Sequence, residues 1–109
     1  MTEELVTLET AKLLKEKGFQ QRKYFINVST LHHCYKYLSV PPQSIAQKWL
    51  RENKKLHIEI SYMYGDYWTY DILTISEHDL VGLSDRPIIH YKSYEEALEA
   101  GIEEALKLI

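Results

Sequence analysis

The chain has 109 residues, which is the length of one domain, and we expect residues 1–109 to fold around a single core. A formal net charge of −3 gives the molecule as a whole no attraction for nucleic acid or anionic membranes. No apolar run reaches the ~18 residues of a membrane span, and the acidic start lacks the apolar region of a signal peptide. The single cysteine excludes an intrachain disulfide. We therefore expect a cytoplasmic protein.

The first predicted element is a helix that follows Thr7 and ends at Gly18. Thr7 is a typical N-cap residue, and Val6 and Ala11 occupy the apolar positions that flank such a cap. Gly18 is placed to end the helix in the left-handed conformation, with Phe19 returning as the apolar contact after it.

A strand is predicted over 23–28, where "KYFINV" is rich in β-branched and aromatic residues. The next stretch, 29–40, is ambiguous, because its start indicates a turn while "CYKYL" is compatible with a second short strand. Its structure, and the role of His32, His33 and Cys34 within it, stay open at this point.

A second helix is predicted from Ser44, directly after the helix-breaking Pro41 and Pro42. Ser44 and Gln47 fit a capping box, in which each side chain bonds the backbone of the other residue. One face of this helix is an apolar stripe that we expect to cover a sheet, with Trp49 buried: Ile45, Ala46, Trp49 and Leu50. The other face is polar and is expected to point into solvent: Gln47, Lys48, Arg51 and Glu52.

Two strands of a hairpin are predicted from the alternation of apolar and polar residues in "LHIEISYM" and "YWTYDILTI". A two-residue loop at Gly65 and Asp66 would place Ile60 opposite Asp71 and split the apolar faces. Because a slip of one residue reverses a whole strand, we predict a three-residue loop. That loop sets the apolar residues level in three pairs: Ile58 with Ile72, Ile60 with Tyr70, and Tyr62 with Trp68.

A third short strand is predicted over 88–91, "IIHY", before a final helix over 93–109. Ser93 and Glu96 fit a capping box. Gly101 stands in mid-helix, where glycine costs ~1 kcal/mol relative to Ala, and we expect that it lets another element approach closely. The predicted fold class is therefore α+β: a small, mostly antiparallel sheet with three helices packed on one face. Its second half has the order α-β-β-β-α.

The sequence offers no recognisable catalytic, metal or cofactor site. His32, His33 and Cys34 carry the right atoms for zinc, but adjacent residues suit a structural zinc site poorly. A pair of carboxylates, Glu59 and Asp71, could face each other across the hairpin, but nothing apolar is expected to enclose them. Enzymatic activity is therefore the third hypothesis, and we predict no cofactor. Its candidate residues are Cys34, His57, Glu59 and Asp71.

Charge is divided unequally between the second and the last helix. Segment 44–55 has four cations against one carboxylate, a net of +3, and the cations are Lys48, Arg51, Lys54 and Lys55. Segment 93–109 has five glutamates against Lys107, a net of −4. The order of elements resembles the double-stranded-RNA-binding domain in topology only, and in that family the last helix starts with basic residues that grip phosphate. Here the same position is acidic and repels phosphate, which argues against nucleic acid as the partner.

The sequence also resembles a family of small uncharacterised proteins from gut bacteria of the Bacteroides type and their phages. The similarity lies in "VTLETAKLLKEKGF", in "QSIAQKWLRE" followed by "HIEI", and in "SYEEALEAGIEEALKLI". Pro42 stands where that family often has Thr, and the stretch 20–40 matches weakly. The resemblance implies the same architecture and a mobile-element setting, and it implies no activity, ligand or site residue.

The leading functional hypothesis is a small non-enzymatic interaction module whose partner is another protein or a second copy of the chain. It depends on the lack of a catalytic constellation and on nine tyrosines among 109 residues, a residue type common on binding surfaces. The alternative is a nucleic-acid-binding protein that uses the cationic helix 44–55.

Overall fold

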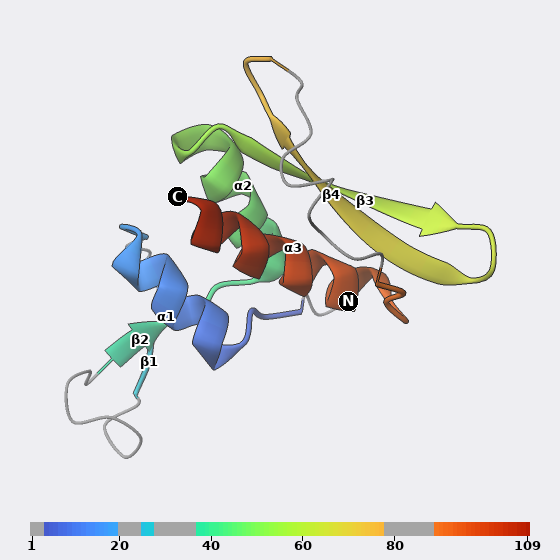
Figure 1. The fold of residues 1–109 in the computed structure, drawn as a ribbon. Coiled ribbons are helices and arrows are strands. Elements are labelled where there is room, and N and C mark those ends of the chain that lie inside the picture. The colour runs from blue at the N-terminus through green and yellow to red at the C-terminus, as the bar shows by residue number, and fades with distance from the viewer. Residues whose placement is uncertain (1–3, 20–24, 28–36, 78–88) are drawn as a thin grey trace.

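The computed structural model describes residues 4–19, 25–27, 37–77 and 89–109 of the chain (Figure 1). Three helices are present: α1 (Leu8–Glu16), α2 (Gln43–Asn53) and α3 (Tyr94–Leu108). Two separate antiparallel pairs of strands accompany them: β1 (Phe25–Asn27) with β2 (Tyr37–Ser39), and β3 (Leu56–Met63) with β4 (Tyr67–Thr74). The chain is thus a small α+β protein, as predicted. Strand β2 lies within the stretch 29–40 that the sequence left open, and residues 29–36 of that stretch lie outside the described part.

The prediction of a third strand at 88–91 is wrong for residues 89–91, which are the part of it that the structure describes. Tyr91 forms only an isolated antiparallel bridge with Trp68, in which the two backbones exchange hydrogen bonds of 2.9 and 3.0 Å. Ile89 and His90 extend no ladder from it, and Ser93 already starts the cap of α3. The order of the second half is therefore α-β-β-α.

Helix α1 has the two ends that its sequence predicts. The Thr7 side chain accepts a hydrogen bond from the Thr10 N–H, which caps the first turn. At the other end Gly18 has a φ of +106°, and the N–H of Phe19 donates to the Leu14 carbonyl at 2.9 Å. A second bond, from the Gly18 N–H to the Lys15 carbonyl, completes the two-bond termination that a left-handed glycine allows.

Helix α2 begins one residue earlier than predicted, and the capping box at Ser44 is wrong. Gln43 is its first residue, Pro42 stands at the N-cap, and no side chain caps the first turn. The segment before α1 takes over this role, because the Gln43 N–H donates to the Glu4 carbonyl at 2.8 Å. The Gln47 side chain, expected in solvent, instead donates through Nε2 to the Ile58 carbonyl of β3 at 2.9 Å.

The hairpin has the predicted register and the predicted three-residue turn. Its pairs include Ile58 with Ile72, Ile60 with Tyr70, and Tyr62 with Trp68, and residues 64–66 form the turn. The even-numbered residues point to the inner face, which packs on helices, and the odd-numbered ones to the outer face. The strict two-residue period of the sequence determined this result.

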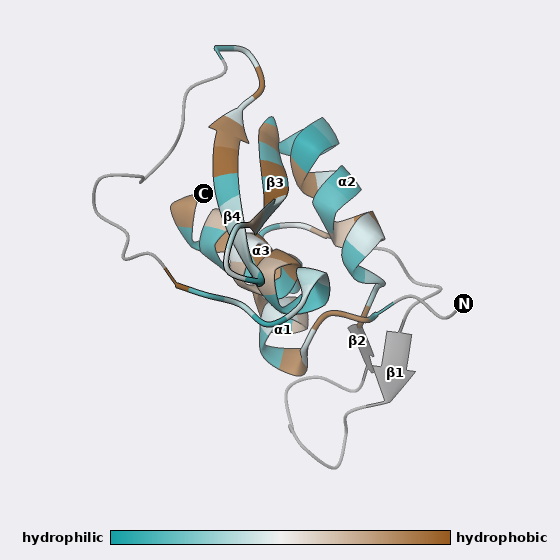
Figure 2. Ribbon diagram, turned by 90° about the vertical axis from the view of Figure 1, so that its right-hand side faces the viewer, coloured by the Kyte–Doolittle hydropathy of each residue, from teal (hydrophilic) through white to brown (hydrophobic). Residues whose placement is uncertain are grey.

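Helix α3 lies across the inner face of β3–β4, and α2 packs beside it on β3 (Figures 1 and 2). Helix α1 packs on α3 and on β2. The buried core is shared by both layers, and its side chains below 2% exposure include Leu14, Leu50, Ile58, Ile72, Ile102 and Leu106. None of the helices in the described part of the chain is long and apolar enough to cross a bilayer.

Trp49 is half-buried rather than fully buried as predicted, and it packs against the border of the core. The ring meets Phe19 edge to face, with 5.7 Å between centroids, so that it joins α2 to the end of α1. The neighbouring stripe residues Ala46 and Leu50 are fully buried, which confirms that α2 is a covering helix. Its Trp therefore seals a helix junction while its smaller residues fill the core.

Gly101 is the point of closest approach between α3 and the hairpin. A Cβ at this position would lie 2.7 Å from Cγ2 of Ile58 and 3.2 Å from the Tyr70 ring. The sequence prediction that this glycine admits another element is confirmed.

We expect Gly101→Ala to destabilise the protein, although alanine is the better helix former. Overpacking costs roughly 1–3 kcal/mol, while the gain in helix propensity is only about 1 kcal/mol. Urea unfolding of Gly101→Ala beside Ala100→Gly, which lies next to it on the less buried side, measures the two effects separately. An increase in the stability of Gly101→Ala would contradict the close packing.

Candidate interaction surface

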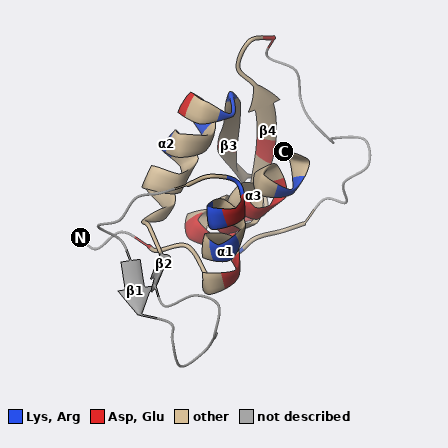
Figure 3. Ribbon diagram, turned by 90° about the vertical axis from the view of Figure 1, so that its left-hand side faces the viewer, with Lys and Arg blue, Asp and Glu red and all other residues tan. Residues whose placement is uncertain are grey.

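The four cations predicted as a site lie together at the end of α2 and the turn into β3 (Figure 3). Lys48, Lys54 and Lys55 are exposed, and Arg51 is half-buried. Two of them are engaged locally: the Lys54 ammonium lies 5.6 Å from the centre of the Trp49 ring, and the Lys55 ammonium donates to the Glu52 carbonyl at 3.2 Å. Cations at this end also suit the helix dipole, so structural roles account for much of the cluster.

The acidic residues of α3 border an open groove of about 400 Å³ between the start of α1 and the first turns of α3. Most of the surface that faces the groove is apolar, although five of its nine lining residues are glutamates: Glu4, Leu5, Thr7, Tyr91, Glu95, Glu96, Glu99, Ala100 and Glu103. These glutamates repel phosphate. Because the second half has the order α-β-β-α, the predicted topological likeness to double-stranded-RNA-binding domains does not hold.

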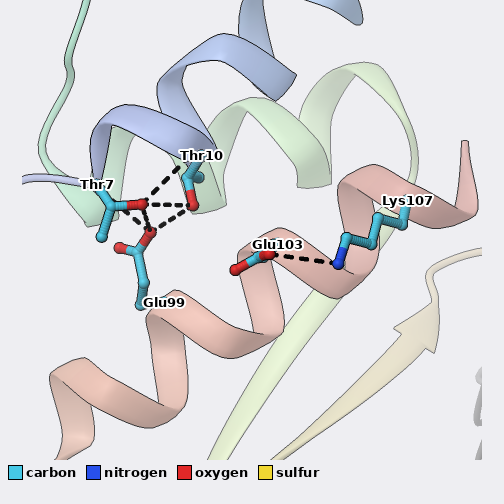
Figure 4. A network of polar contacts seen from close by, with 5 residues as sticks. All are labelled: Thr7, Thr10, Glu99, Glu103 and Lys107. Carbon is cyan, nitrogen blue, oxygen red and sulfur yellow. Dashed lines mark hydrogen bonds and ion pairs between the residues drawn. The ribbon is translucent and has the colours of Figure 1, made fainter.

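One carboxylate that borders this groove, that of Glu99 on α3, joins all three helices. Figure 4 shows its contacts with Thr7 and Thr10 at the start of α1. Its Oε2 accepts from the backbone N–H and the hydroxyl of Thr7, both at 3.1 Å, and from the Thr10 hydroxyl. Its Oε1 accepts from Nε2 of Gln43 at 3.0 Å, and the same Nε2 lies 2.9 Å from the Glu95 carbonyl. Thr10 and Gln43 are buried, so Glu99 is a structural residue that supplies acceptors where the starts of α1 and α2 need them.

The hydrogen bonds of Glu99 were missed by the sequence analysis, which counted this residue only as one of five acids. Thr7 and Glu99 are separated by 92 positions in the chain, and no local pattern connects them. The start of α1 was the one sequence feature that pointed to these bonds. A threonine cap with a second threonine in the first turn presents hydrogen-bond donors, and each buried donor needs an acceptor.

The candidate catalytic residues of the hairpin lie together on its outer face. Nε2 of His57 lies 3.0 Å from a carboxylate oxygen of Glu59, and Glu59 pairs across the strands with Asp71. The Glu59 side chain is 54% exposed, and the groove described above does not include these residues. Cys34, the fourth candidate, lies outside the described residues.

A metal site finds no support in the part of the chain that the structure describes. Within those ranges no three side chains of His, Cys, Asp or Glu are grouped so that they could hold an ion. His32, His33 and Cys34, the zinc candidates, lie outside them.

Aromatic and apolar side chains gather at the far end of the hairpin, and we call this cluster the aromatic tip: Tyr62, Met63, Tyr64, Trp68 and Tyr94. Tyr62 is 57% exposed, Met63 is 40% exposed and Tyr64 is fully exposed. The rings form a chain of contacts, with centroids 4.8 Å apart between Tyr62 and Trp68 and 5.7 Å apart between Trp68 and Tyr94. Because α3 begins at Tyr94, the inner face of the hairpin continues past the helix that covers it, so Tyr62 remains exposed there and Trp68 is only half-buried.

The turn holds the tip in a defined shape. Gly65 and Asp66 both have positive φ, 104° and 64°, and the Tyr62 hydroxyl donates to the Asp66 carboxylate at 2.6 Å. This hydrogen bond, with a smaller contribution from desolvation, raises the pKa of Tyr62 above its ordinary value of 10.0. The Tyr62 ring is thus held in place on a turn of defined backbone shape, whereas Tyr64 is fully exposed.

Comparison of the chain with profiles of known protein families, with curated protein sequences and with solved structures finds no significant match. The resemblance to proteins of gut bacteria and their phages accordingly stays a prediction, and the surface has to be interpreted from its own geometry.

We expect Glu99→Gln to destabilise the protein by about 1–2 kcal/mol, because an amide places a donor where acceptors are needed at the start of α1. Glu103→Gln is the matched control. Glu103 lies one turn further along α3 and, within the described ranges, forms an ion pair with the exposed Lys107 at 3.3 Å. Its loss should change stability by less than about 0.5 kcal/mol. Equal denaturation midpoints for the two variants would show that Glu99 does not join the helices.

We expect Asp66→Asn to lower the pKa of Tyr62 toward 10.0. Asparagine also tolerates positive φ, so the turn is kept while the charged acceptor is lost. In the unmodified protein the hydrogen bond stabilises the fold below the unfolded pKa of the phenol, and this contribution disappears as pH rises through the higher folded pKa. Titration of labelled tyrosine ring carbons by NMR measures the shift, and an unchanged midpoint would contradict the assignment.

Proposed function

We propose that this protein is a small non-enzymatic interaction module that binds a protein partner through the aromatic tip. The observation that carries the proposal is the exposure of Tyr62, Met63 and Tyr64 on an ordered turn. Tyr, Trp and Met are the residue types enriched at protein interfaces, and rings that are already fixed lose little conformational entropy on binding.

The rest of the described surface supports this choice. In the outer-face group, Glu59 is exposed while His57 and Asp71 are half-buried. The cationic residues at the end of α2 are partly used by their own helix. The acidic start of α3 disfavours a phosphate backbone as partner. The resemblance to proteins of gut bacteria and phages supports a mobile-element origin, and with it a partner inside the bacterial cytoplasm.

The test compares two double variants of the immobilised protein in capture from a bacterial lysate. Met63→Ser with Tyr64→Ser removes exposed tip side chains that are absent from the core, so folding should be unaffected. Lys48→Ala with Arg51→Ala removes two cations and serves as the matched control. We expect the tip variant to lose a captured protein by about tenfold or more and the cation variant to retain it.

The opposite result would overturn the proposal. Loss of binding in the cation variant alone, together with a salt-dependent gel shift on nucleic acid, would favour the alternative function. Thermal melts of both variants show whether each one is folded when it is tested.

A further inference from the structure

The two outer edges of the hairpin are protected unequally. In an antiparallel pair, alternate residues turn their backbone N–H and C=O groups away from the partner strand. Here these are the even-numbered residues, because Trp68 uses both groups to bond Tyr91 and the Ile58 carbonyl accepts from Gln47. The bridge to Tyr91 therefore occupies the β4 edge at Trp68, and α2 occupies the β3 edge at Ile58.

The second half of β3 has no such protection. Among the described residues, no backbone or side chain outside the hairpin bonds the outward groups of Ile60 and Tyr62. Figure 2 shows α2 beside β3, and Figure 1 shows the far half of the hairpin projecting past α2 and α3. Natural edges are commonly blunted by lysine, proline or a bulge, and the segment Ile60–Met63 contains none of these.

We propose that this edge of β3 pairs with the same edge of a second copy of the chain. The two β3 strands run antiparallel about a two-fold axis and join the two hairpins into one four-stranded sheet, β4-β3-β3-β4. The inference rests on the proposed function, since it names a second copy as a partner at the same end of the hairpin.

The register follows from the groups that are free. Ile60 of each copy pairs with Tyr62 of the other, so that each residue uses both its outward N–H and its outward C=O, and Ser61 faces Ser61 across the axis. The shift that pairs Ile60 with Ile60 requires the Ile58 carbonyl, which Gln47 already occupies. The shift that pairs Tyr62 with Tyr62 extends the ladder to Tyr64, which belongs to the turn.

The side chains are self-complementary in this register. On the inner face the half-buried Ile60 lies beside Tyr62 of the other copy, whose ring is 57% exposed in the single chain. On the outer face Glu59 lies opposite Met63, whereas a register with Glu59 opposite Glu59 would place like charges together. The contact is short, so we expect a dimer whose population depends on concentration.

The first experiment is disulfide trapping of Ser61→Cys in a Cys34→Ser background, where the new cysteine is the only thiol. Facing residues of a pair that is not hydrogen-bonded have Cα atoms about 4.5 Å apart, which is within the range of a disulfide. We expect a covalent dimer after mild oxidation. Glu59→Cys in the same background is the matched control and should cross-link far less, because Glu59 faces Met63 of the other copy. Equal or stronger cross-linking of Glu59→Cys would overturn the register and the proposal.

The second experiment measures the mass of the unmodified chain by light scattering over a range of concentrations, beside Tyr62→Pro and Tyr62→Thr. Both variants lose the ring, but only proline also removes the outward N–H, and it leaves the ladder with β4 intact. We expect the mass of the unmodified chain to approach that of a dimer as its concentration rises. We expect Tyr62→Pro to need a higher concentration than Tyr62→Thr to form the dimer. A monomer at every concentration, or equal dissociation of the two variants, would overturn the inference.

Failure of this inference can be distinguished from failure of the proposed function. A monomer that still captures a protein in a tip-dependent manner would show that the partner is a different chain, so the second-copy inference fails and the interaction module stands. A monomer whose capture is unaffected by Met63→Ser with Tyr64→Ser would refute both.

Discussion

The fold depends on one carboxylate. Glu99 lies near the middle of α3 and satisfies the donors that the start of α1 exposes, while its second oxygen binds the first residue of α2. Three helix segments that are distant in the sequence therefore meet at one side chain. This contact fixes the position of α1 on α3, and it leaves the other side of α3, with Gly101, free to lie directly on the hairpin.

The elements that the sequence predicted correctly are those determined by neighbouring residues. The alternation in β3 and β4 was sufficient for the register, since only a three-residue turn aligns Ile58 with Ile72. The termination of α1 at Gly18 and Phe19, and the glycine contact of α3, are likewise readable from local patterns. Each of these features depends on a periodicity or on the conformational freedom of one residue.

The errors occur where a distant segment replaced a local partner. Ser44 lost its predicted capping role because the Glu4 backbone approaches the first N–H of α2. The strand predicted at 88–91 reduced to one bridge at Tyr91. The cations of helix 44–55 were predicted as a candidate surface. The sequence could not show that α3 stops short of the end of the hairpin and leaves Tyr62 exposed. That result depends on how far one element extends over another.

The two tryptophans of the chain lie in separate parts of this architecture. Trp49 meets the Phe19 ring edge to face at the junction of α1 and α2, and Trp68 stands between Tyr62 and Tyr94 at the tip. Their fluorescence therefore reports on different events, the first on assembly of the helical layer and the second on the surroundings of the hairpin end. Replacing either one by phenylalanine turns the same small protein into an intrinsic optical probe for one of these events alone.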